Sequence, residues 1–405
     1  MAQDPADTTH LIHHPYTPPT DFEAPQPGVF KASTVYFPSV AAMRSREWKN
    51  KTGYTYGLHG TPTTYALEER ISTLEGGLQT LLVPSGLAAI ANVALSLLKT
   101  GETVLIPDNA YGPSKTLAEG ELKAWGIRSI YYDPMSPADL QAKITPETKL
   151  VWVEAAGSVT LEFPDLVAQV RICKQAGVTV ALDNTWGAGL AFNAFDLVPG
   201  ESLGVDVSAH ALTKYPSGGG DVLMGAITTR DLGLHMRLKL THMRLGLGVG
   251  ANDAELVLRA LPSIALRYRA HDEATRTLAH WAQQQAAFAQ VLHPALENSP
   301  GHAYWKALCV NGCGGAAGLF SVVVDARYSQ EQCDTFCNSL KLFKIGYSWG
   351  GPISLVVPYE LASMRQSWPA HLAQGTLVRF SIGLEQVDDL RADLAQALAA
   401  AGMAG

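Results

Sequence analysis

Short apolar runs alternate with helical stretches between residues 60 and 210, and this alternation limits the folds that the chain can adopt. Strands that are apolar throughout are typical of sheets covered on both faces, and successive parallel strands need long crossovers, usually helices. We therefore predict an α/β fold with a mainly parallel sheet between two layers of helices. The predicted strands are Leu78–Val83, Thr103–Ile106, Ile127–Tyr132, Leu150–Glu154, Val178–Asp183 and Asp206–His210.

Three helices are predicted among these strands. One starts near Thr63 and ends at Gly76-Gly77, a second spans Leu87–Leu98, and a third covers Asp165–Gln175. The glycine pair supplies the left-handed residue that commonly ends a helix.

The pattern changes near Asn252, where long helical periodicity begins. It covers Asp253–Leu261 and continues past Pro262 to about Gln290. Phe320–Val324 and Thr376–Ile382 are predicted strands, and a closing amphipathic helix has the buried face Val387, Leu390, Leu394 and Leu398. We predict a smaller α+β domain here, with an N-terminal arm over residues 1–60, a ligand-binding domain over 61–260 and the second domain over 261–405.

Charge and hydropathy exclude several classes of partner. The 405 residues carry a formal net charge of −7, which argues against nucleic acid or an anionic membrane. No apolar run approaches the roughly 20 residues that span a bilayer. Met1–Asp7 has neither the basic nor the apolar part of a secretory signal, so we expect a cytoplasmic protein acting on a small molecule.

Two groups of residues could suggest a metal. Cys309 and Cys313, and Cys333 and Cys337, have four-residue spacings, but they lack the short zinc-knuckle spacing and a suitable His pair. His10, His13 and His14 lie among Pro15, Pro18, Pro19, Pro25 and Pro27, which oppose a helix that would hold the imidazoles together. We expect no metal site, reduced thiols, and a solvated arm that lies on another surface, such as a second subunit.

Polar residues follow several of the predicted strands. Ligands of open α/β sheets bind at the carboxyl ends of the strands, and Tyr111, Asp183 and Lys214 lie at or just after such ends. Pro84-Ser85-Gly86 turns into a helix, and the free N–H groups at a helix N-terminus bind anions. The turn lacks a dinucleotide or Walker fingerprint and is weak by itself.

Lys214 and Asp183 together point to one cofactor. Lys214 has apolar neighbours that should lower its pKa and make its amine a nucleophile, although a surface lysine after a strand is an alternative. Asp183 ends an apolar strand and is either a turn cap or the partner of a cation. An amine and a carboxylate are the two protein groups that pyridoxal phosphate (PLP) requires, with Tyr111 suited to cover one ring face.

Seven collinear motifs carry a family resemblance over about Asp7–Leu394. The chain resembles the PLP enzymes of cysteine and methionine metabolism, in particular their beta-lyases. The motifs are Leu203–Gly225, Asp183-Asn184-Thr185-Trp186, Pro84-Ser85-Gly86, Asn109-Ala110-Tyr111, His293-Pro294-Ala295-Leu296, Tyr347-Ser348-Trp349-Gly350-Gly351 and Leu377-Val378-Arg379.

The resemblance implies roles for single residues. Lys214 would hold PLP covalently and remove the substrate α-proton, Asp183 would face the ring nitrogen, and Tyr111 would stack on the ring. Arg379 would bind the substrate carboxylate, because its planar fork suits that group. Further contacts are implied for Gly86, Leu87, Thr213 and Thr185 with the cofactor and for Ser348 and Trp349 with the substrate.

The resemblance also implies an assembly and a reaction. The fold would be fold type I with a seven-stranded sheet, and the protein a homotetramer of dimers in which Tyr56 reaches the neighbouring subunit's phosphate. The reaction would be β-elimination of an amino-acid thioether, cystathionine giving homocysteine, pyruvate and ammonia. Trp349, Gly112 and Glu154-Ala155-Ala156-Gly157-Ser158 match the beta-lyases better than the gamma enzymes.

Some positions depart from the family pattern. Leu58 stands where many relatives have a phosphate-binding arginine, which leaves His59 as a substitute, and Ala211 lacks a serine hydroxyl. Pro352-Ile353 replaces an aromatic–Glu pair, so the sulfur substrate could differ. A cysteine desulfhydrase or broad cysteine-S-conjugate beta-lyase, a gamma-lyase or gamma-synthase, and a cofactor-bound regulator without catalysis are the alternatives.

Overall fold

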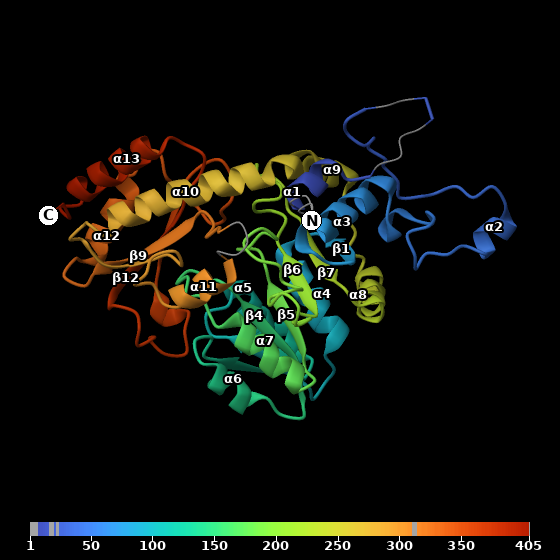
Figure 1. Ribbon diagram of the computed structural model, residues 1–405, viewed down its shortest axis with the longest axis horizontal. Helices are drawn as coiled ribbons and strands as arrows, with labels where there is room; N and C mark the ends of the chain where they lie inside the picture. Colours follow the sequence, from blue (N-terminus) through green and yellow to red (C-terminus); the bar gives the residue numbers. More distant parts are fainter. Residues whose placement is uncertain (1–6, 16–19, 22–23, 310–313, 405) are drawn as a thin grey trace.

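A seven-stranded sheet forms the larger part of the molecule (Figure 1). The computed structural model describes residues 7–15, 20–21, 24–309 and 314–404. The strand order is β1-β7-β6-β5-β4-β2-β3, and only β7 runs against the others. The predicted mainly parallel sheet is confirmed, although β7 had not been predicted as a strand. The strands are β1 Gln79–Val83, β2 Thr103–Pro107, β3 Arg128–Tyr132, β4 Thr148–Glu154, β5 Thr179–Asp183, β6 Val207–His210 and β7 Gly225–Thr229.

Alternate side chains of each central strand enter different apolar clusters. In β4, Val151 and Val153 pack in one cluster with helices α3 and α7, whereas Leu150 and Trp152 pack in another with α4 and α8. Strand side chains alternate across a sheet, so helices cover both faces as predicted. The helices of this part are α3 Pro62–Glu75, α4 Gly86–Leu97, α5 Gly112–Leu117, η2 Ala118–Leu122, α6 Pro137–Lys143, α7 Leu166–Gln175, α8 Leu232–Leu245 and α9 Ala251–Ala260.

Helix α3 shows how local sequence sets the ends of an element. Thr61 caps its N-terminus by accepting a hydrogen bond from the Thr64 N–H, and Pro62 occupies the first turn. Gly76 ends the helix with φ +73°, a left-handed conformation that glycine adopts without strain. The predicted helix and its glycine end are confirmed.

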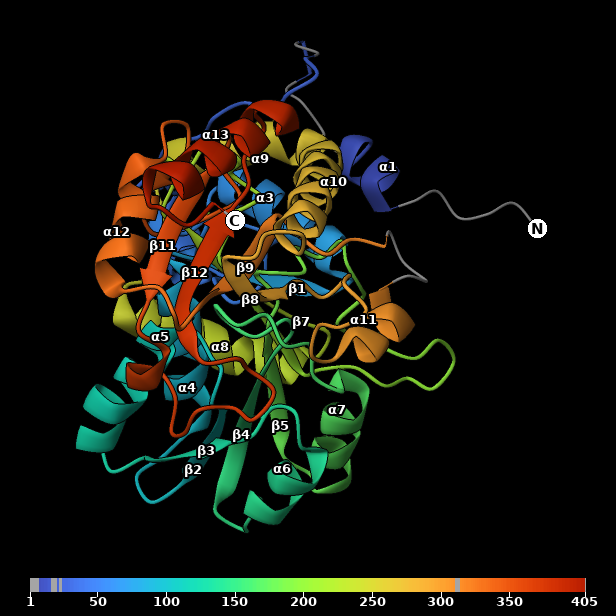
Figure 2. The ribbon, with the colours of Figure 1, turned by 90° about the vertical axis from the view of Figure 1, so that its left-hand side faces the viewer.

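A second, five-stranded sheet has the order β10-β11-β12-β9-β8 and packs with α10, α12 and α13 around its own core (Figure 2). The predicted strands and the closing helix are present, with Leu390, Leu394 and Leu398 buried and Val387 partly buried. The elements are β8 Phe288–Leu292, β9 Leu319–Asp325, β10 Lys344–Ile345, β11 Leu355–Tyr359, β12 Gly375–Ser381, α10 Ile264–Ala282, α11 His302–Cys309, α12 Gln330–Ser339 and α13 Val387–Ala400.

One predicted helix boundary is wrong. Helix α10 ends at Ala282 instead of near Gln290, and Phe288 begins strand β8. The apolar residues Phe288 and Val291 gain more by packing in the second core and pairing with β9 than a longer helix would offer. The proposed domain boundaries at residues 60 and 260 stay a prediction.

The N-terminal arm is more ordered than predicted. Residues Asp7–Ile12 form helix α1, Leu11 is buried in the main core, and His14 Nε2 lies 3.1 Å from Thr73 Oγ1. The expectation of a solvated arm is therefore wrong at this end, because α1 packs on α3. Pro18, Pro19 and residues 1–6 lie outside the described residues.

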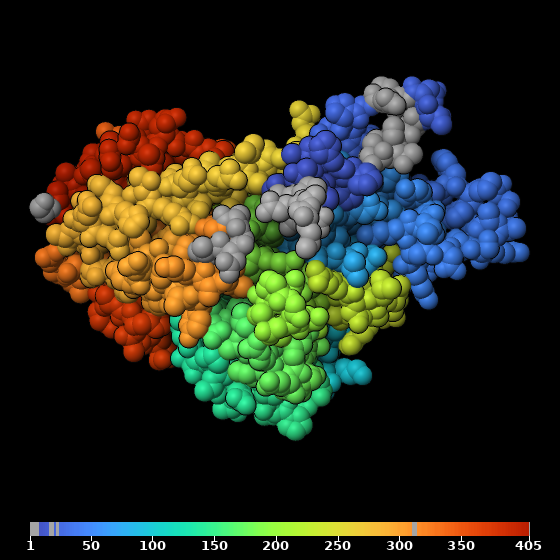
Figure 3. Space-filling model, in the orientation of Figure 1, coloured from blue at the N-terminus to red at the C-terminus, as the bar shows by residue number. Residues whose placement is uncertain are grey.

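The segment of residues 35–50 extends away from the body of the protein (Figures 1 and 3). It contains helix α2 Val40–Arg44 and exposes several apolar side chains, with Tyr36 93% accessible. None of the helices among the described residues is long and apolar enough to cross a membrane.

Candidate active site

A cavity of about 580 Å³ lies where the carboxyl ends of the main strands meet the second sheet. Asp183 ends β5, Glu154 ends β4, and Lys214 follows β6. Tyr111 precedes α5 and Gly86 opens α4. The structure thus brings together the predicted residues Lys214, Asp183, Tyr111, Gly86, Leu87, Thr213, Thr185, Arg379, Ser348 and Trp349.

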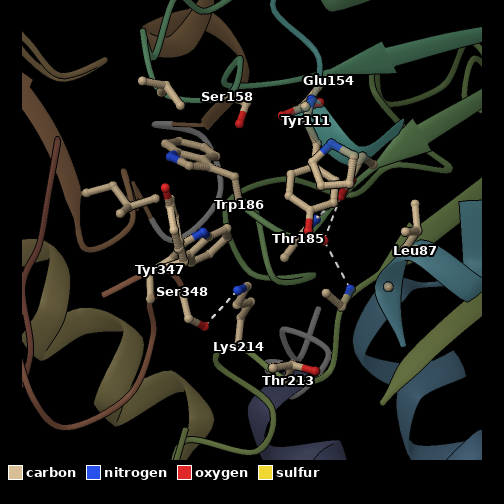
Figure 4. Close-up of a pocket in the computed structure, with 18 of the residues that line it drawn as sticks. Leu87, Tyr111, Glu154, Ser158, Thr185, Trp186, Thr213, Lys214, Tyr347 and Ser348 are labelled. Carbon is tan, nitrogen blue, oxygen red and sulfur yellow. Dashed lines mark hydrogen bonds between the residues drawn. The ribbon is translucent and has the colours of Figure 1, made fainter. Parts of the chain in front are cut away.

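Lys214 is held by the loop between β10 and β11. Its Nζ donates to Ser348 Oγ at 2.7 Å and lies 5.3 Å from the centre of the Trp349 ring (Figure 4). Burial and then the charge of Arg379 lower the pKa of Lys214, and Asp183 acts in the opposite direction, which leaves the pKa at about 8. This confirms the lowered pKa expected from the apolar neighbours.

Gly350 allows that loop to come so close. Its φ is +79°, and a Cβ at this position would lie 2.9 Å from the Tyr215 nitrogen. A side chain would therefore push Ser348 and Trp349 away from Lys214.

Asp183 is fixed by the loop that follows its strand. It accepts hydrogen bonds from the Thr185 hydroxyl at 2.6 Å and the Thr185 N–H at 3.0 Å. The same hydroxyl accepts from the Ala211 N–H, so Thr185 joins the ends of β5 and β6. Burial raises the pKa of Asp183, while Thr185, His210 and Lys214 favour its charged form. A cation opposite Asp183 would complete this arrangement.

Glu154 is a second buried carboxyl beside Asp183 that the sequence reasoning missed as a site residue. The two residues are register partners in β4 and β5, and Glu154 Oε2 accepts from the Tyr111 N–H at 2.9 Å. Burial and then the charge of Asp183 raise the pKa of Glu154 well above its usual range. The reasoning used for Asp183, a carboxylate at the end of an apolar strand, would have found it.

Arg379 reaches the cavity from β12. Its side chain is buried, its Nε has no hydrogen-bond partner among the described residues, and its guanidinium lies 5.3 Å from the Tyr359 ring centre. Burial lowers the pKa of Arg379, and the three nearby tyrosines oppose this. A buried cation with an unsatisfied donor is suited to an anionic ligand group.

The N-terminus of α4 offers a second anion site. Ser85 accepts from the Ala88 N–H, which leaves the N–H groups of Gly86 and Leu87 without intrahelical acceptors. Thr213 lies in the same cavity, but its hydroxyl already exchanges hydrogen bonds with the backbone of Met224.

Tyr56 and His59 lie elsewhere. Tyr56 is 47% exposed and does not line the cavity of its own chain, so its predicted reach to a neighbouring subunit stays a prediction. The His59 ring lies tilted against Trp48, with 5.3 Å between the ring centres, and its Nδ1 contacts Thr55 Oγ1. Burial and then nearby cations lower the pKa of His59. The predicted role of His59 in place of the arginine that is missing at Leu58 stays a prediction.

The described residues contain no cluster of three or more metal-ligating His, Cys, Asp or Glu side chains. Cys173, Cys309, Cys333 and Cys337 are buried, and Cys313 lies outside the described part of the chain.

These groups fit PLP. The amine of Lys214, the carboxylate of Asp183, the Tyr111 ring and the α4 N-terminus face one cavity, and Arg379 retains a buried unsatisfied donor for a substrate carboxylate.

Comparison with known proteins agrees with this fit. The model of the protein family described as Cys/Met metabolism PLP-dependent enzyme matches residues 8–399. A putative cystathionine beta-lyase of Rhizobium johnstonii is 39% identical over 93% of this chain and 91% of its own. A cystathionine beta-lyase of Bordetella avium is 38% identical over 96% of each chain, and a cystathionine gamma-lyase of Bacillus subtilis is 32% identical over 86% of this chain and 89% of its own.

A solved structure gives the same result. A putative O-acetylhomoserine (thiol)-lyase of Campylobacter jejuni, which carries N′-pyridoxyl-lysine-5′-monophosphate, superimposes with a TM-score of 0.88 at 25% identity. The match covers 97% of this chain and 100% of that one, and it confirms the predicted fold.

Proposed function

The chain belongs to the Cys/Met metabolism PLP-dependent enzyme family, and from that premise we propose that it is a carbon–sulfur beta-lyase that cleaves L-cystathionine to homocysteine, pyruvate and ammonia. The observation that carries the proposal is the placement of Lys214 against Ser348 and Trp349, the pair that resembles the beta-lyases. The two relatives of highest identity reported above also bear the beta-lyase name.

The chain's own residues account for substrate binding and proton transfer. Arg379 binds the α-carboxylate and orients the Cα–H bond toward Lys214, an orientation worth on the order of 7–11 kcal/mol of barrier. The neutral Lys214 amine takes the α-proton, and Ser348 Oγ keeps that amine in place. PLP, when bound, supplies the electron sink for the pair released from the Cα–H bond. The bond from the β-carbon to sulfur then breaks, homocysteine leaves as a thiol after its sulfur takes up a proton, and water hydrolyses the remaining three-carbon fragment to pyruvate and ammonia.

Product analysis tests this proposal. The purified holoenzyme is given L-cystathionine, and the keto acid and thiol are identified. β-Elimination yields pyruvate and homocysteine, whereas γ-elimination yields 2-oxobutyrate and cysteine. L-Cysteine as a second substrate tests the desulfhydrase alternative, which predicts the higher kcat/KM on cysteine.

A lysine variant separates catalysis from a cofactor-bound scaffold. We expect Lys214→Ala to lower kcat by roughly 10²–10⁴-fold or more. Lys123→Ala, at an exposed position, is the matched control and should keep wild-type kcat. Pyruvate release at the wild-type rate from Lys214→Ala would refute the assignment.

The assembly is part of the proposal. The exposed apolar side chains of the arm support contact with a second chain. We propose a homotetramer in which two chains share each active site, and a cytoplasmic location remains a prediction.

A further inference from the structure

The connection between β11 and β12 is longer than its geometry requires. These strands are antiparallel neighbours, which about two to five residues can join, yet residues 360–374 lie between them. We call residues 361–372 the strap. Long connections without much secondary structure are commonly functional.

A buried ion pair fixes the strap to the main part of the molecule. Arg365 Nη2 lies 2.9 Å from Glu162 Oε1, and the two side chains are only 4% and 1% exposed. His371, near the end of the strap, reaches the same carboxylate at 3.0 Å. Glu162 therefore binds the strap at two points.

A second anchor holds the backbone that follows Met364 Cα. Lys115 Nζ donates to the Met364 carbonyl at 2.7 Å and to Asp108 Oδ1 at 3.0 Å. The Gln366 N–H donates to the same Asp108 carboxylate at 3.1 Å. The backbone that follows Met364 Cα is consequently held at two neighbouring points.

The Met364 side chain lies between an apolar cluster and the active-site cavity. It packs with Leu361, Leu372 and Val159, and both Met364 and Val159 line the cavity. A thioether has no strong donor, so Met364 offers the cavity an apolar, adaptable wall and cannot hold a phosphate or carboxylate.

We infer that Met364 is a specificity-determining residue that contacts the thioether arm of the substrate beyond the β-carbon, and that Arg365 is a positioning residue that acts through it. The inference rests on the proposed function, because it takes the ligand to be an amino-acid thioether. Lys214 and Arg379 account for the amine and carboxylate end, which leaves the distal arm for the apolar wall.

Two unreactive amino acids test the wall in the holoenzyme. 2,7-Diaminosuberate has the length of cystathionine with carbon in place of sulfur, and L-alanine has no distal arm. Calorimetry gives both dissociation constants for the wild type and for Met364→Ala, Met364→Trp and Met364→Leu. We expect Met364→Ala and Met364→Trp to raise the dissociation constant of diaminosuberate about tenfold or more and to change that of alanine by no more than about twofold. Both variants should raise KM for cystathionine more than they lower kcat.

Two results decide the outcome: the affinity of the conservative variant Met364→Leu, and the ratio of the diaminosuberate to the alanine dissociation constant. Met364→Leu should keep the dissociation constant of diaminosuberate within about threefold of the wild-type value. Equal fold-changes in both dissociation constants, which leave their ratio unchanged, would overturn the inference. So would a wild type that does not bind diaminosuberate. A wild type that binds diaminosuberate but releases no pyruvate from cystathionine would instead refute the proposed function.

The positioning role has its own variant. Arg365→Met leaves Glu162 buried without its partner and could prevent folding, so Glu162→Gln is combined with it. This double variant should weaken the binding of diaminosuberate and leave the binding of alanine unchanged. Adding Met364→Ala should cause little further loss of affinity, because both changes act through the Met364 side chain. Fully additive losses would overturn the positioning role.

Discussion

At the scale of single residues, Lys214 is the group whose surroundings most affect its chemistry. Its amine lies among apolar and aromatic side chains, with Ser348 as acceptor and Arg379 as a nearby cation. Burial and the charge of Arg379 favour the neutral amine, whereas Asp183 favours the charged form. The residue is therefore prepared both to bind an aldehyde and to accept a proton.

PLP loading of the apoprotein should report this pKa. Only the neutral amine condenses with an aldehyde, so a pKa of about 8 predicts a loading rate that rises roughly tenfold between pH 7 and pH 9 and then levels off. The measurement is the absorbance change after mixing apoprotein with PLP.

Two variants should move this midpoint in opposite directions. Arg379→Met removes a cation and should raise the pKa of Lys214, whereas Asp183→Asn removes an anion and should lower it further. Identical midpoints in all three proteins would contradict the electrostatic account.

At the scale of elements, the C-terminal end of α3 organises the strands that carry the site. Glu75 accepts hydrogen bonds from Asn184 Nδ2 at 2.8 Å, Ser208 Oγ at 2.7 Å and His210 Nδ1 at 2.6 Å. Asn184 follows Asp183, and Ser208 and His210 belong to β6, which leads to Lys214. One buried carboxylate thus fixes the strand ends that hold both key residues.

Glu75→Gln should show the importance of this acceptor. The NH₂ group of the glutamine would face the donors of Asn184, Ser208 or His210 in place of an accepting oxygen. We therefore expect a loss of about 1–3 kcal/mol in the free energy of unfolding. Glu69→Gln, on the exposed side of the same helix, is the control and should stay within about 0.5 kcal/mol. Urea denaturation of both variants provides the comparison, and equal stabilities would argue against the network.

At the scale of the whole molecule, the ion pair between Glu162 and Arg365 joins the part that contains the seven-stranded sheet to the part that contains the five-stranded sheet. Burial alone would raise the pKa of Glu162, but Arg365 and hydrogen bonds from His371, Thr160 and Asn109 lower it to about 2. Because the folded pKa lies below the unfolded value, the pair stabilises the protein above about pH 4.5 and loses this effect as the pH falls toward 2.

Acid unfolding should reveal this contribution. Across that range the wild type should lose on the order of 3 kcal/mol more stability than the Glu162→Gln/Arg365→Met double variant, whose paired groups no longer titrate. Denaturant titrations of the apoproteins from pH 6 to pH 3 would detect the onset of the difference. Parallel pH profiles would contradict it.

The proposed sharing of sites between subunits can be tested by mixing two inactive chains. A hybrid of Lys214→Ala and Tyr56→Leu chains contains one site with both native groups if Tyr56 acts on the neighbouring subunit. We expect co-expressed hybrids to regain activity that neither parent has, and light scattering to give four times the chain mass of 43.3 kDa. Failure to regain activity would place Tyr56 outside the shared site.

The sequence by itself determined the elements and the candidates at their ends. Alternating apolar runs predicted the main sheet, and polar residues after those runs identified Asp183, Lys214 and Tyr111, because these signals depend on neighbours within one element. The end of α10 was predicted wrongly and helix α1 was missed, since contacts with distant segments, such as β9 and α3, outweighed the local pattern.

Only the tertiary structure decided how the second sheet completes the site. Lys214 and Ser348 are 134 residues apart in the sequence, yet Lys214 Nζ lies 2.7 Å from Ser348 Oγ, and no periodicity of the sequence predicts such a pair. Glu154 beside Asp183 and Met364 at the cavity wall likewise depend on strand order and on the packing of the strap. The physical reason is that local sequence sets backbone conformation, whereas the approach of distant surfaces is decided by the packing of the whole core.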